Sequence, residues 1–262
     1  MKRLLPSVIC LLCCLFAPGT IQANDPAVVS TEHATVTLMS EPATVAADQT
    51  LWLGLRFELI PHWHVYWRNP GASGTAPVIR WTLPVGWETG EVHWPVPKRI
   101  RVGPLVNYGY EDAVVLLVPV RVPPGPLPAG PHTITADTEW LVCQVECIPE
   151  SGRLALTLDH TGSGTPADTA THELFNATRA QWPEPITLAG RYRLEGDRIS
   201  IAVGLPGLFP RAPTDLWFAA GEWGPVDASG AQRWEQTGTE LSLGVAAGDV
   251  PPAGYSPLEG LL

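Results

Sequence analysis

The chain has 262 residues, a formal net charge of -10 and a pI near 5.1. Nucleic acids and anionic lipid surfaces are polyanions that would repel such a protein, so neither is expected as a partner. Proline (28) and glycine (25) are abundant and only 16% of the residues are charged, a composition that favours many short strands joined by turns. We therefore expect an all-β protein that acts on another protein or a small molecule.

The N-terminus has the pattern of a secretory signal peptide. Two basic residues precede an apolar run over residues 4–16, and the sequence Ile21-Gln22-Ala23 offers a small-residue cleavage site. The apolar run is shorter than the roughly 20 residues that a membrane-spanning helix needs. We predict a signal peptide over residues 1–23 and export to the periplasm.

The next part of the chain predicts an antiparallel β-sandwich. In residues 50–59 leucines and Phe57 alternate with other residues, a period of two that is typical of a strand. Turn sequences rich in proline and glycine, such as Asn69-Pro70-Gly71, separate the segments. Strands are expected over residues 34–40, 50–59, 64–67, 78–83, 114–120, 132–140 and 153–158. Two packed sheets would place residues 24–160 in one domain.

A linker, a helix and a second β region are expected to follow. Residues 161–167 are rich in glycine and threonine, and Asp168 can cap a helix that runs to about Gln181. We assign residues 161–183 to this linker and helix, and residues 184–262 to a second domain. Its strands are predicted over residues 199–203, 214–219 and 240–245. Because the chain ends soon after a turn-like sequence, this domain is expected to be incomplete: either the chain is a fragment or the domain is small.

Cys143 and Cys147 are the only cysteines left after removal of the signal peptide. A disulfide needs Cα atoms about 4.4 to 6.8 Å apart, whereas the same spacing in an extended strand would be about 13 Å. If the two cysteines bond, the chain must turn between them, in a tight hairpin or at a bulged strand end that exposes the pair at a sheet edge. The nearby Glu146 and Glu150 are expected to raise the thiol pKa values.

Three uses of this pair are open on the residues alone. A five-residue ring stabilises a fold by only about 2 kcal/mol in the chain-entropy model, so a passive staple is a weak use. A local bridge can instead be exchangeable and carry electrons. A thiolate pair with histidine could also hold copper(I) or zinc, and His62, His64 and His93 lie in the same region. Their spacing to the cysteines does not support a site, so neither a metal ligand nor a cofactor is assigned.

Three motifs in order give the chain a family resemblance. Residues Trp63–Gly74, Gly103–Glu111 and Trp140–Glu150 resemble the N-terminal periplasmic region of the DsbD family of thiol:disulfide interchange proteins, closest to the branch containing the suppressor of copper sensitivity protein B. In that family an immunoglobulin-like domain carries the cysteine pair. It receives electrons from a membrane-embedded domain through a thioredoxin-like domain and passes them to periplasmic oxidoreductases and disulfide isomerases.

The resemblance implies an immunoglobulin-like sandwich with protein-disulfide reductase activity. It implies that Cys147 forms mixed disulfides and that Cys143 resolves them, with a thioredoxin-like reductant as one partner. Membrane association would come only through downstream domains that this chain lacks. A copper-binding module for copper tolerance, and an interaction domain with a structural disulfide, remain the alternatives.

The resemblance also implies a cap loop that shields the pair. The matching residues are Asn107, Tyr108, Gly109 and Tyr110, and Gly109 would let the loop bend sharply. Asn107 stands where the family carries an aromatic residue, so Tyr108 or Tyr110 is expected to shield instead. The cysteines also have three residues between them where the better-known members have five. The Trp-Arg-Asn-Pro-Gly stretch is expected to be scaffold.

Overall fold

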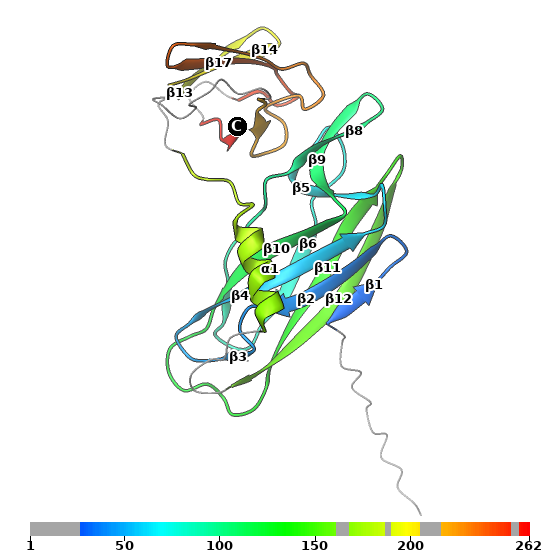
Figure 1. Cartoon of the computed structure of the whole chain (residues 1–262), viewed down its shortest axis with the longest axis vertical. Coiled ribbons are helices and arrows are strands. Elements are labelled where there is room, and N and C mark those ends of the chain that lie inside the picture. Colours follow the sequence, from blue (N-terminus) through cyan, green and yellow to red (C-terminus); the bar gives the residue numbers. More distant parts are fainter. Residues whose placement is uncertain (1–26, 161–167, 187–189, 205–215, 253–256) are drawn as a thin grey trace, which may run out of the picture.

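The protein is built mainly from strands, with one helix in the part that is described (Figure 1). The computed structural model describes residues 27–160, 168–186, 190–204, 216–252 and 257–262. The predicted signal peptide and the predicted linker at 161–167 lie outside these residues. No helix among them is long and apolar enough to cross a membrane.

One sheet of the first domain has the strand order β1-β2-β4-β10-β7, and all its pairs are antiparallel. Its strands are β1 (Val28–Ser30), β2 (Ala34–Ser40), β4 (Thr50–Leu59), β10 (Ala113–Arg121) and β7 (Glu88–Thr89). The alternation predicted for residues 50–59 is confirmed, because Leu51, Leu53, Leu55 and Phe57 are buried.

The second sheet has the order β3-β12-β11-β5-β9-β8, and β6 pairs with β11 beside this path. Its strands are β3 (Thr44–Val45), β12 (Cys147–His160), β11 (His132–Cys143), β5 (His64–Gly71), β9 (Leu105–Glu111), β8 (Lys98–Val102) and β6 (Val78–Thr82). The short β3–β12 pair is parallel, and the other pairs are antiparallel.

The two sheets share one core, which confirms the predicted sandwich. Val36, Leu55 and Phe57 from the first sheet meet Trp67 and Trp140 from the second in the same buried cluster. The rings of Phe57 and Trp140 lie edge to face, with centroids 5.6 Å apart. Aromatic pairs of this kind bury large apolar areas, so they hold the layers together.

Two turns or loops predicted from the sequence are strands. The prediction of a turn at Asn69-Pro70-Gly71 is wrong, because β5 continues to Gly71 through an irregularity in its pairing with β9. Proline is tolerated at such an irregularity because the ladder hydrogen bond it cannot donate is absent there. The expected cap loop is β9 itself, paired with β8 on one side and β5 on the other.

Helix α1 (Thr169–Arg179) packs on the outer face of the first sheet. The predicted cap is confirmed, since the Asp168 carboxylate accepts hydrogen bonds from the backbone N–H and the hydroxyl of Thr171. Phe175 is fully buried against Val115 and Leu117 of β10. The helix therefore belongs to the body of the sandwich.

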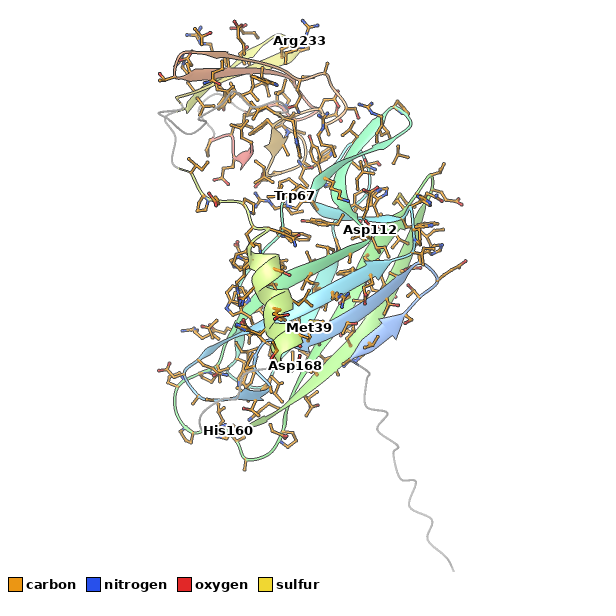
Figure 2. All side chains as sticks on the ribbon, in the orientation of Figure 1. Met39, Trp67, Asp112, His160, Asp168 and Arg233 are labelled. Atoms are coloured by element: carbon orange, nitrogen blue, oxygen red, sulfur yellow. A yellow bond between two sulfur atoms is a disulfide. The ribbon has the colours of Figure 1, made fainter. Side chains whose placement is uncertain are left out.

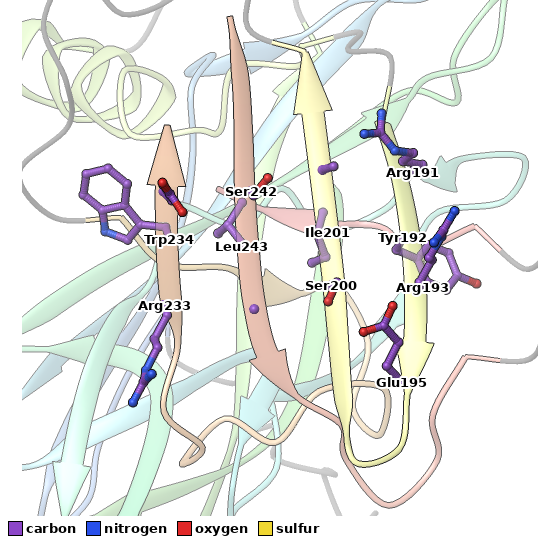
Figure 3. A pocket seen from close by; sticks show the side chains of 13 residues that line it. Arg191, Tyr192, Arg193, Glu195, Ser200, Ile201, Arg233, Trp234, Ser242 and Leu243 are labelled. Carbon is purple, nitrogen blue, oxygen red and sulfur yellow. The ribbon is translucent and has the colours of Figure 1, made fainter. Parts of the chain in front are cut away.

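The remaining strands form a four-stranded sheet, β13-β14-β17-β16, and a two-stranded one, β15-β18. Their bounds are β13 (Gly190–Glu195), β14 (Arg198–Gly204), β15 (Ala219–Ala220), β16 (Arg233–Thr237), β17 (Glu240–Ala246) and β18 (Gly260–Leu261). The strands predicted at 199–203 and 240–245 are confirmed, while part of the one predicted at 214–219 lies outside the described residues. The face of the larger sheet turned from its core is a shallow open hollow with Arg191, Arg193 and Arg233 at its sides (Figure 3).

The second group of strands contacts the first domain at β5 and β9. Trp67 lies at the end of the sandwich that faces these strands (Figure 2), and Tyr108 packs edge to face against it. Trp217 stacks on Tyr108, with centroids 5.4 Å apart. The buried amide of Asn69 donates to the carbonyl oxygens of Ala220 (2.8 Å) and Glu222 (3.0 Å). The Asn-Pro-Gly stretch thus joins the two parts.

Truncation of Phe175 to alanine tests how the helix is held. A buried phenylalanine replaced by alanine typically costs about 3 to 5 kcal/mol, because apolar burial is lost and a cavity remains. We expect a loss of this size in the free energy of unfolding, measured by urea denaturation. The exposed Glu173→Ala change is the matched control and should leave stability within about 0.5 kcal/mol; equal effects of the two changes would contradict the packing described.

Candidate functional site

The two cysteines close the end of the longest strand ladder in the described part of the chain. Strands β11 and β12 are paired through twelve residue pairs, and the last pair is Cys143 opposite Cys147. Their sulfurs form a disulfide with an S–S distance of 2.04 Å and a Cα–Cα distance of 4.2 Å. The three residues between them make the turn, in which the Gln144 N–H donates to the Glu146 carbonyl oxygen. Of the two arrangements predicted for a bonded pair, the structure has the tight hairpin, but it exposes only Cys147, since Cys143 is buried and paired with β5 as well.

The two halves of the disulfide differ in exposure. Cys143 is buried, with 2% of its surface accessible, whereas Cys147 is exposed at the start of β12. The turn beside them is exposed as well, and the Val145 side chain is 87% accessible. Because exchange requires a thiolate to reach a disulfide sulfur, Cys147 is the member of the pair that a partner can approach.

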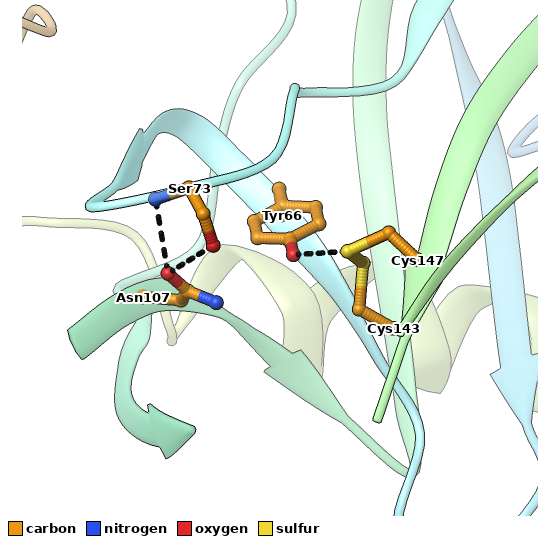
Figure 4. The surroundings of a disulfide bond; sticks show 5 residues. All are labelled: Tyr66, Ser73, Asn107, Cys143 and Cys147. Atoms are coloured by element: carbon orange, nitrogen blue, oxygen red, sulfur yellow. Dashed lines mark hydrogen bonds between the residues drawn. A yellow bond between two sulfur atoms is a disulfide. The ribbon is translucent and has the colours of Figure 1, made fainter. Parts of the chain in front are cut away.

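Tyr66 of β5 is the aromatic residue that touches the disulfide (Figure 4). Its hydroxyl lies 3.3 Å from Cys147 Sγ, and its ring is fully buried. Burial raises the pKa of Tyr66, and a hydrogen bond with Ser73 offsets part of that rise. The phenol therefore stays protonated at neutral pH and can donate a hydrogen bond to the sulfur.

The segment at Ser73 and Gly74 lies against Tyr66. A Cβ atom added at Gly74 would be 2.1 Å from Tyr66 Cζ, and the backbone there has φ +90°. Glycine is needed at this position on both counts, since a side chain would strike the ring and strain the backbone. Asn107 holds the segment in place, because its Oδ1 accepts hydrogen bonds from Ser73 N (3.2 Å) and Ser73 Oγ (3.0 Å).

The other expected cap residues lie in β9 and are buried. Tyr108 packs against Trp67 and Trp217, and the Tyr110 hydroxyl donates to the carbonyl oxygen of Pro95. Burial raises the pKa of Tyr108 to about 12 and that of Tyr110 further. Gly109 does not bend the chain: a Cβ there would be 2.2 Å from the Val65 carbonyl oxygen, so glycine allows β5 to approach closely. The structure thus brings Asn107 to the site through Ser73 and directs both tyrosine hydroxyls elsewhere.

Sequence reasoning missed Tyr66 as a site residue. It lies inside the first of the three motifs, in a stretch expected to be scaffold. Its signal is its position two residues after His64, on the face of β5 that the register turns toward the cysteines. Without the register, no pattern in the sequence assigns that face.

Glu150 lies three residues after Cys147, and its carboxylate is enclosed by donors. Its side chain is 7% accessible and pairs with His33, whose Nδ1 is 2.8 Å from Oε1. The Thr31 hydroxyl, the His33 backbone N–H and the Trp140 indole N–H also donate to it. This cluster ties the base of the cysteine hairpin to the turn between β1 and β2. Glu150 is thus a structural anchor, and Glu146 is the exposed acid of the turn.

Histidines considered as metal ligands do not gather around the cysteines. Among the described residues no group of three or more histidine, cysteine, aspartate or glutamate side chains is placed to hold a metal ion. His64 alone is opposite a cysteine in the sheet, while His93 lies between Trp52 and Trp182.

An antiparallel sandwich with a disulfide at an accessible hairpin tip defines the class: an immunoglobulin-like domain that carries a cysteine pair. Residues 35–159 match the family described as "Thiol:disulfide interchange protein DsbD, N-terminal". This match confirms the resemblance seen in the three motifs and supports a role in thiol-disulfide chemistry.

A solved structure extends the likeness beyond these residues. The chain is similar to the N-terminal periplasmic domain of ScsB from Proteus mirabilis, with 21% identity and a TM-score of 0.62. The alignment covers 86% of this chain and 85% of that one, so the shared fold includes the second group of strands. No curated protein sequence matches the chain.

Replacement of Glu150 by alanine tests the anchor beneath the hairpin. A buried donor that loses its acceptor typically costs about 1 to 3 kcal/mol, and Thr31, His33 and Trp140 all donate to the Glu150 carboxylate. We expect Glu150→Ala to lower the free energy of unfolding by about 3 kcal/mol in urea denaturation. Glu146→Ala is the control, four residues away and exposed, and should change little. A Glu150→Ala protein as stable as this control would show that the cluster does not hold the hairpin.

Proposed function

We propose that the chain is a periplasmic protein-disulfide reductase domain that carries electrons on Cys143 and Cys147. It takes them from a thioredoxin-like reductant and gives them to periplasmic oxidoreductases such as disulfide isomerases. The observation that carries this proposal is the bond between an exposed Cys147 and a buried Cys143 at a hairpin tip. The match of residues 35–159 to the family model supports the same chemistry.

Reduction of the domain follows from this asymmetry. A thiolate of the reductant attacks Cys147 Sγ, the bond to Cys143 breaks, and Cys143 leaves with the electron pair and takes up a proton. The second thiolate of the reductant then attacks its own sulfur in the mixed disulfide, and Cys147 is released. Two electrons have entered the domain and the reductant has become a disulfide.

Delivery of the electrons reverses these roles. The Cys147 thiolate attacks a disulfide of the substrate protein and forms a mixed disulfide. Cys143 then attacks Cys147 Sγ, which restores the domain's disulfide and releases the substrate as a dithiol. Cys147 is therefore the cysteine that meets partners and Cys143 the one that resolves.

The surroundings of the pair support this division. The Tyr66 hydroxyl, 3.3 Å from Cys147 Sγ, can donate to the sulfur and favour its thiolate. The Ser73–Gly74 segment, which Asn107 holds by hydrogen bonds, lies against Tyr66 and shields it. Tyr108, Gly109 and Tyr110 serve the cap by fixing β9 beneath that segment.

The place of action and the domain layout complete the proposal. The predicted signal peptide over residues 1–23 and the likeness to a periplasmic domain of ScsB support export. We assign residues 24–160 to the redox domain, 161–183 to the linker and helix, and 184–262 to the second domain.

Trapping of mixed disulfides tests the roles of the two cysteines. The reduced Cys143→Ser protein keeps the exposed thiol and lacks the resolving one. It should accumulate an adduct with a thioredoxin-like protein whose resolving cysteine is removed and whose remaining cysteine is joined to glutathione, with glutathione as the leaving thiol. The Cys147→Ser protein keeps only the buried thiol and should form at least about tenfold less adduct. Non-reducing electrophoresis with mass spectrometry measures both. Equal trapping, or trapping only through Cys143, would contradict the assignment.

Replacement of Tyr66 by phenylalanine tests the hydrogen bond to Cys147. A hydrogen bond to a charged group is worth about 1.5 to 3 kcal/mol, so its loss should lower the thiolate fraction of reduced Cys147. We expect roughly tenfold slower reaction with a small disulfide at pH 7, followed by stopped-flow. At a pH where the thiol is fully ionised the two proteins should react at similar rates; a defect that is independent of pH would argue for a packing role instead.

A further inference from the structure

Four side chains from four neighbouring strands form one row across the second sheet. Glu111 of β9 is opposite His64 of β5, His64 is opposite Cys143 of β11, and Cys143 is opposite Cys147 of β12. Residues directly opposite in antiparallel strands point to the same face, with Cα atoms about 4.5 to 5.5 Å apart. A carboxylate, an imidazole and the two sulfurs therefore stand in sequence on one face.

His64 has an unused polar atom in this row. Its side chain is buried, with 2% of the residue accessible, and its Nε2 has no hydrogen-bond partner among the described residues. Its ring lies edge to face with that of Tyr66, with centroids 5.2 Å apart. A buried ring nitrogen without a partner costs free energy, so its persistence calls for a function. The disulfide form offers it no proton, whereas the reduced form places a thiol beside it.

The protonation state of His64 suits the acceptance of a proton. Burial lowers the pKa of His64, and the negative charge of Glu111 opposes that shift. The imidazole is therefore neutral at pH 7, and a neutral imidazole keeps one ring nitrogen as a proton acceptor. The other ionisable groups on its neighbours are the two cysteines, Tyr66 and Lys98, which pairs with Glu111 at 3.2 Å.

We propose that His64 is the proton acceptor and donor for Cys143, an inference that rests on the proposed exchange function. In the resolving step the Cys143 thiol gives its proton to His64 Nε2 while its sulfur attacks Cys147 Sγ. The bond from Cys147 to the partner breaks, and the partner sulfur leaves with the electron pair as a thiolate. In the reducing step His64 takes up a proton from solvent and gives it to Cys143 as that sulfur leaves.

Glu111 completes the arrangement. The imidazolium formed in the resolving step is stabilised by the carboxylate next to it in the row, as the opposing effect of Glu111 on the His64 pKa indicates. Cys143 needs this help more than Cys147, because it is buried away from the water that could otherwise take its proton. The two thiols thus have separate assistance: Tyr66 for the exposed one and His64 for the buried one.

The test separates attack from resolution in the full chain. Reduced protein is mixed with oxidised glutathione, quenched with acid at intervals, and analysed by mass spectrometry for the glutathione adduct and the intramolecular disulfide. Attack by Cys147 depends on the glutathione concentration, and resolution by Cys143 does not. General base catalysis contributes about 10² to 10⁴ in rate where it operates, so His64→Gln should slow resolution at pH 7 at least about tenfold and let the adduct accumulate. Attack should change little.

The pH profile distinguishes proton transfer from packing. In the wild-type protein the resolution rate should rise with pH through the titration of His64 and then level off. In His64→Gln the resolution rate should keep rising with pH until the Cys143 thiol itself is ionised. Glu111→Gln, at a partly exposed position, should shift the wild-type midpoint to lower pH, because the imidazolium loses its negative neighbour. This second variant decides the matter if His64→Gln does not fold.

Each remaining outcome has a definite reading. Three results would overturn the role of His64 while the exchange function stands. They are an unchanged resolution rate in His64→Gln, equal slowing of attack and resolution, and a pH midpoint that Glu111→Gln does not move. If the wild-type protein forms neither adduct nor disulfide with glutathione or with a thioredoxin-like protein, the exchange function itself is wrong.

Discussion

The register of the β11–β12 ladder is the constraint on which the site depends. Side chains in a strand alternate between faces, so a shift of one residue would turn every side chain of β12 to the opposite face and separate the sulfurs. Twelve consecutive pairs fix that register, and Trp140 opposite Glu150 marks it three pairs from the end. The same register places His64 beside Cys143. The disulfide, the hairpin and the side chains next to the cysteines thus all depend on one strand register.

The environment then makes two chemically similar residues unequal. Cys143 ends β11, where β12 and β5 pair with it on both sides, while Cys147 is exposed at the start of β12. Close backbone approaches complete the surroundings: Gly74 admits the ring of Tyr66 and Gly109 admits the carbonyl of Val65. The site is built on the paired ends of neighbouring strands, which suits a reaction that needs a buried sulfur to face an exposed one in a fixed geometry.

Local sequence patterns predicted several elements of this chain correctly. Alternation predicted β4, the Asp168 side chain predicted the start of α1, and the distance between cysteines predicted the hairpin. Local patterns failed where a segment's hydrogen-bonding partners are distant in the sequence. Pro70 and Gly71 read as a turn because nothing local shows that Asn69 is held by Ala220 and Glu222, about 150 residues later. Strand β9 was taken for a loop for the same reason, since its two neighbouring strands supply the pairing.

Side-chain roles were harder to foresee than elements. The carboxylate of Glu150 is hydrogen-bonded to His33, 117 positions earlier, so a carboxylate that looked free beside the thiols is held by a tertiary contact. Tyr66 and His64 sit in a motif that reads as scaffold, and only the pairing of β5 with β11 turns them to the sulfurs. The motif resemblance identified the two cysteines, and only the pairing of the strands identified Tyr66 and His64 as their neighbours.

The stacking of Trp217 on Tyr108 bears on how the redox domain can be isolated. Val106 N also relies on Ser229 Oγ, 2.9 Å away, so strand β9 draws both an apolar cover and a hydrogen bond from beyond residue 216. A recombinant fragment cut after helix α1 would present a bare indole-sized patch around Tyr108 and an unmatched amide at the rim of its sheet. Uncovered aromatic surface beside unpaired backbone invites self-association, so such a fragment would be prone to pair with its own copies.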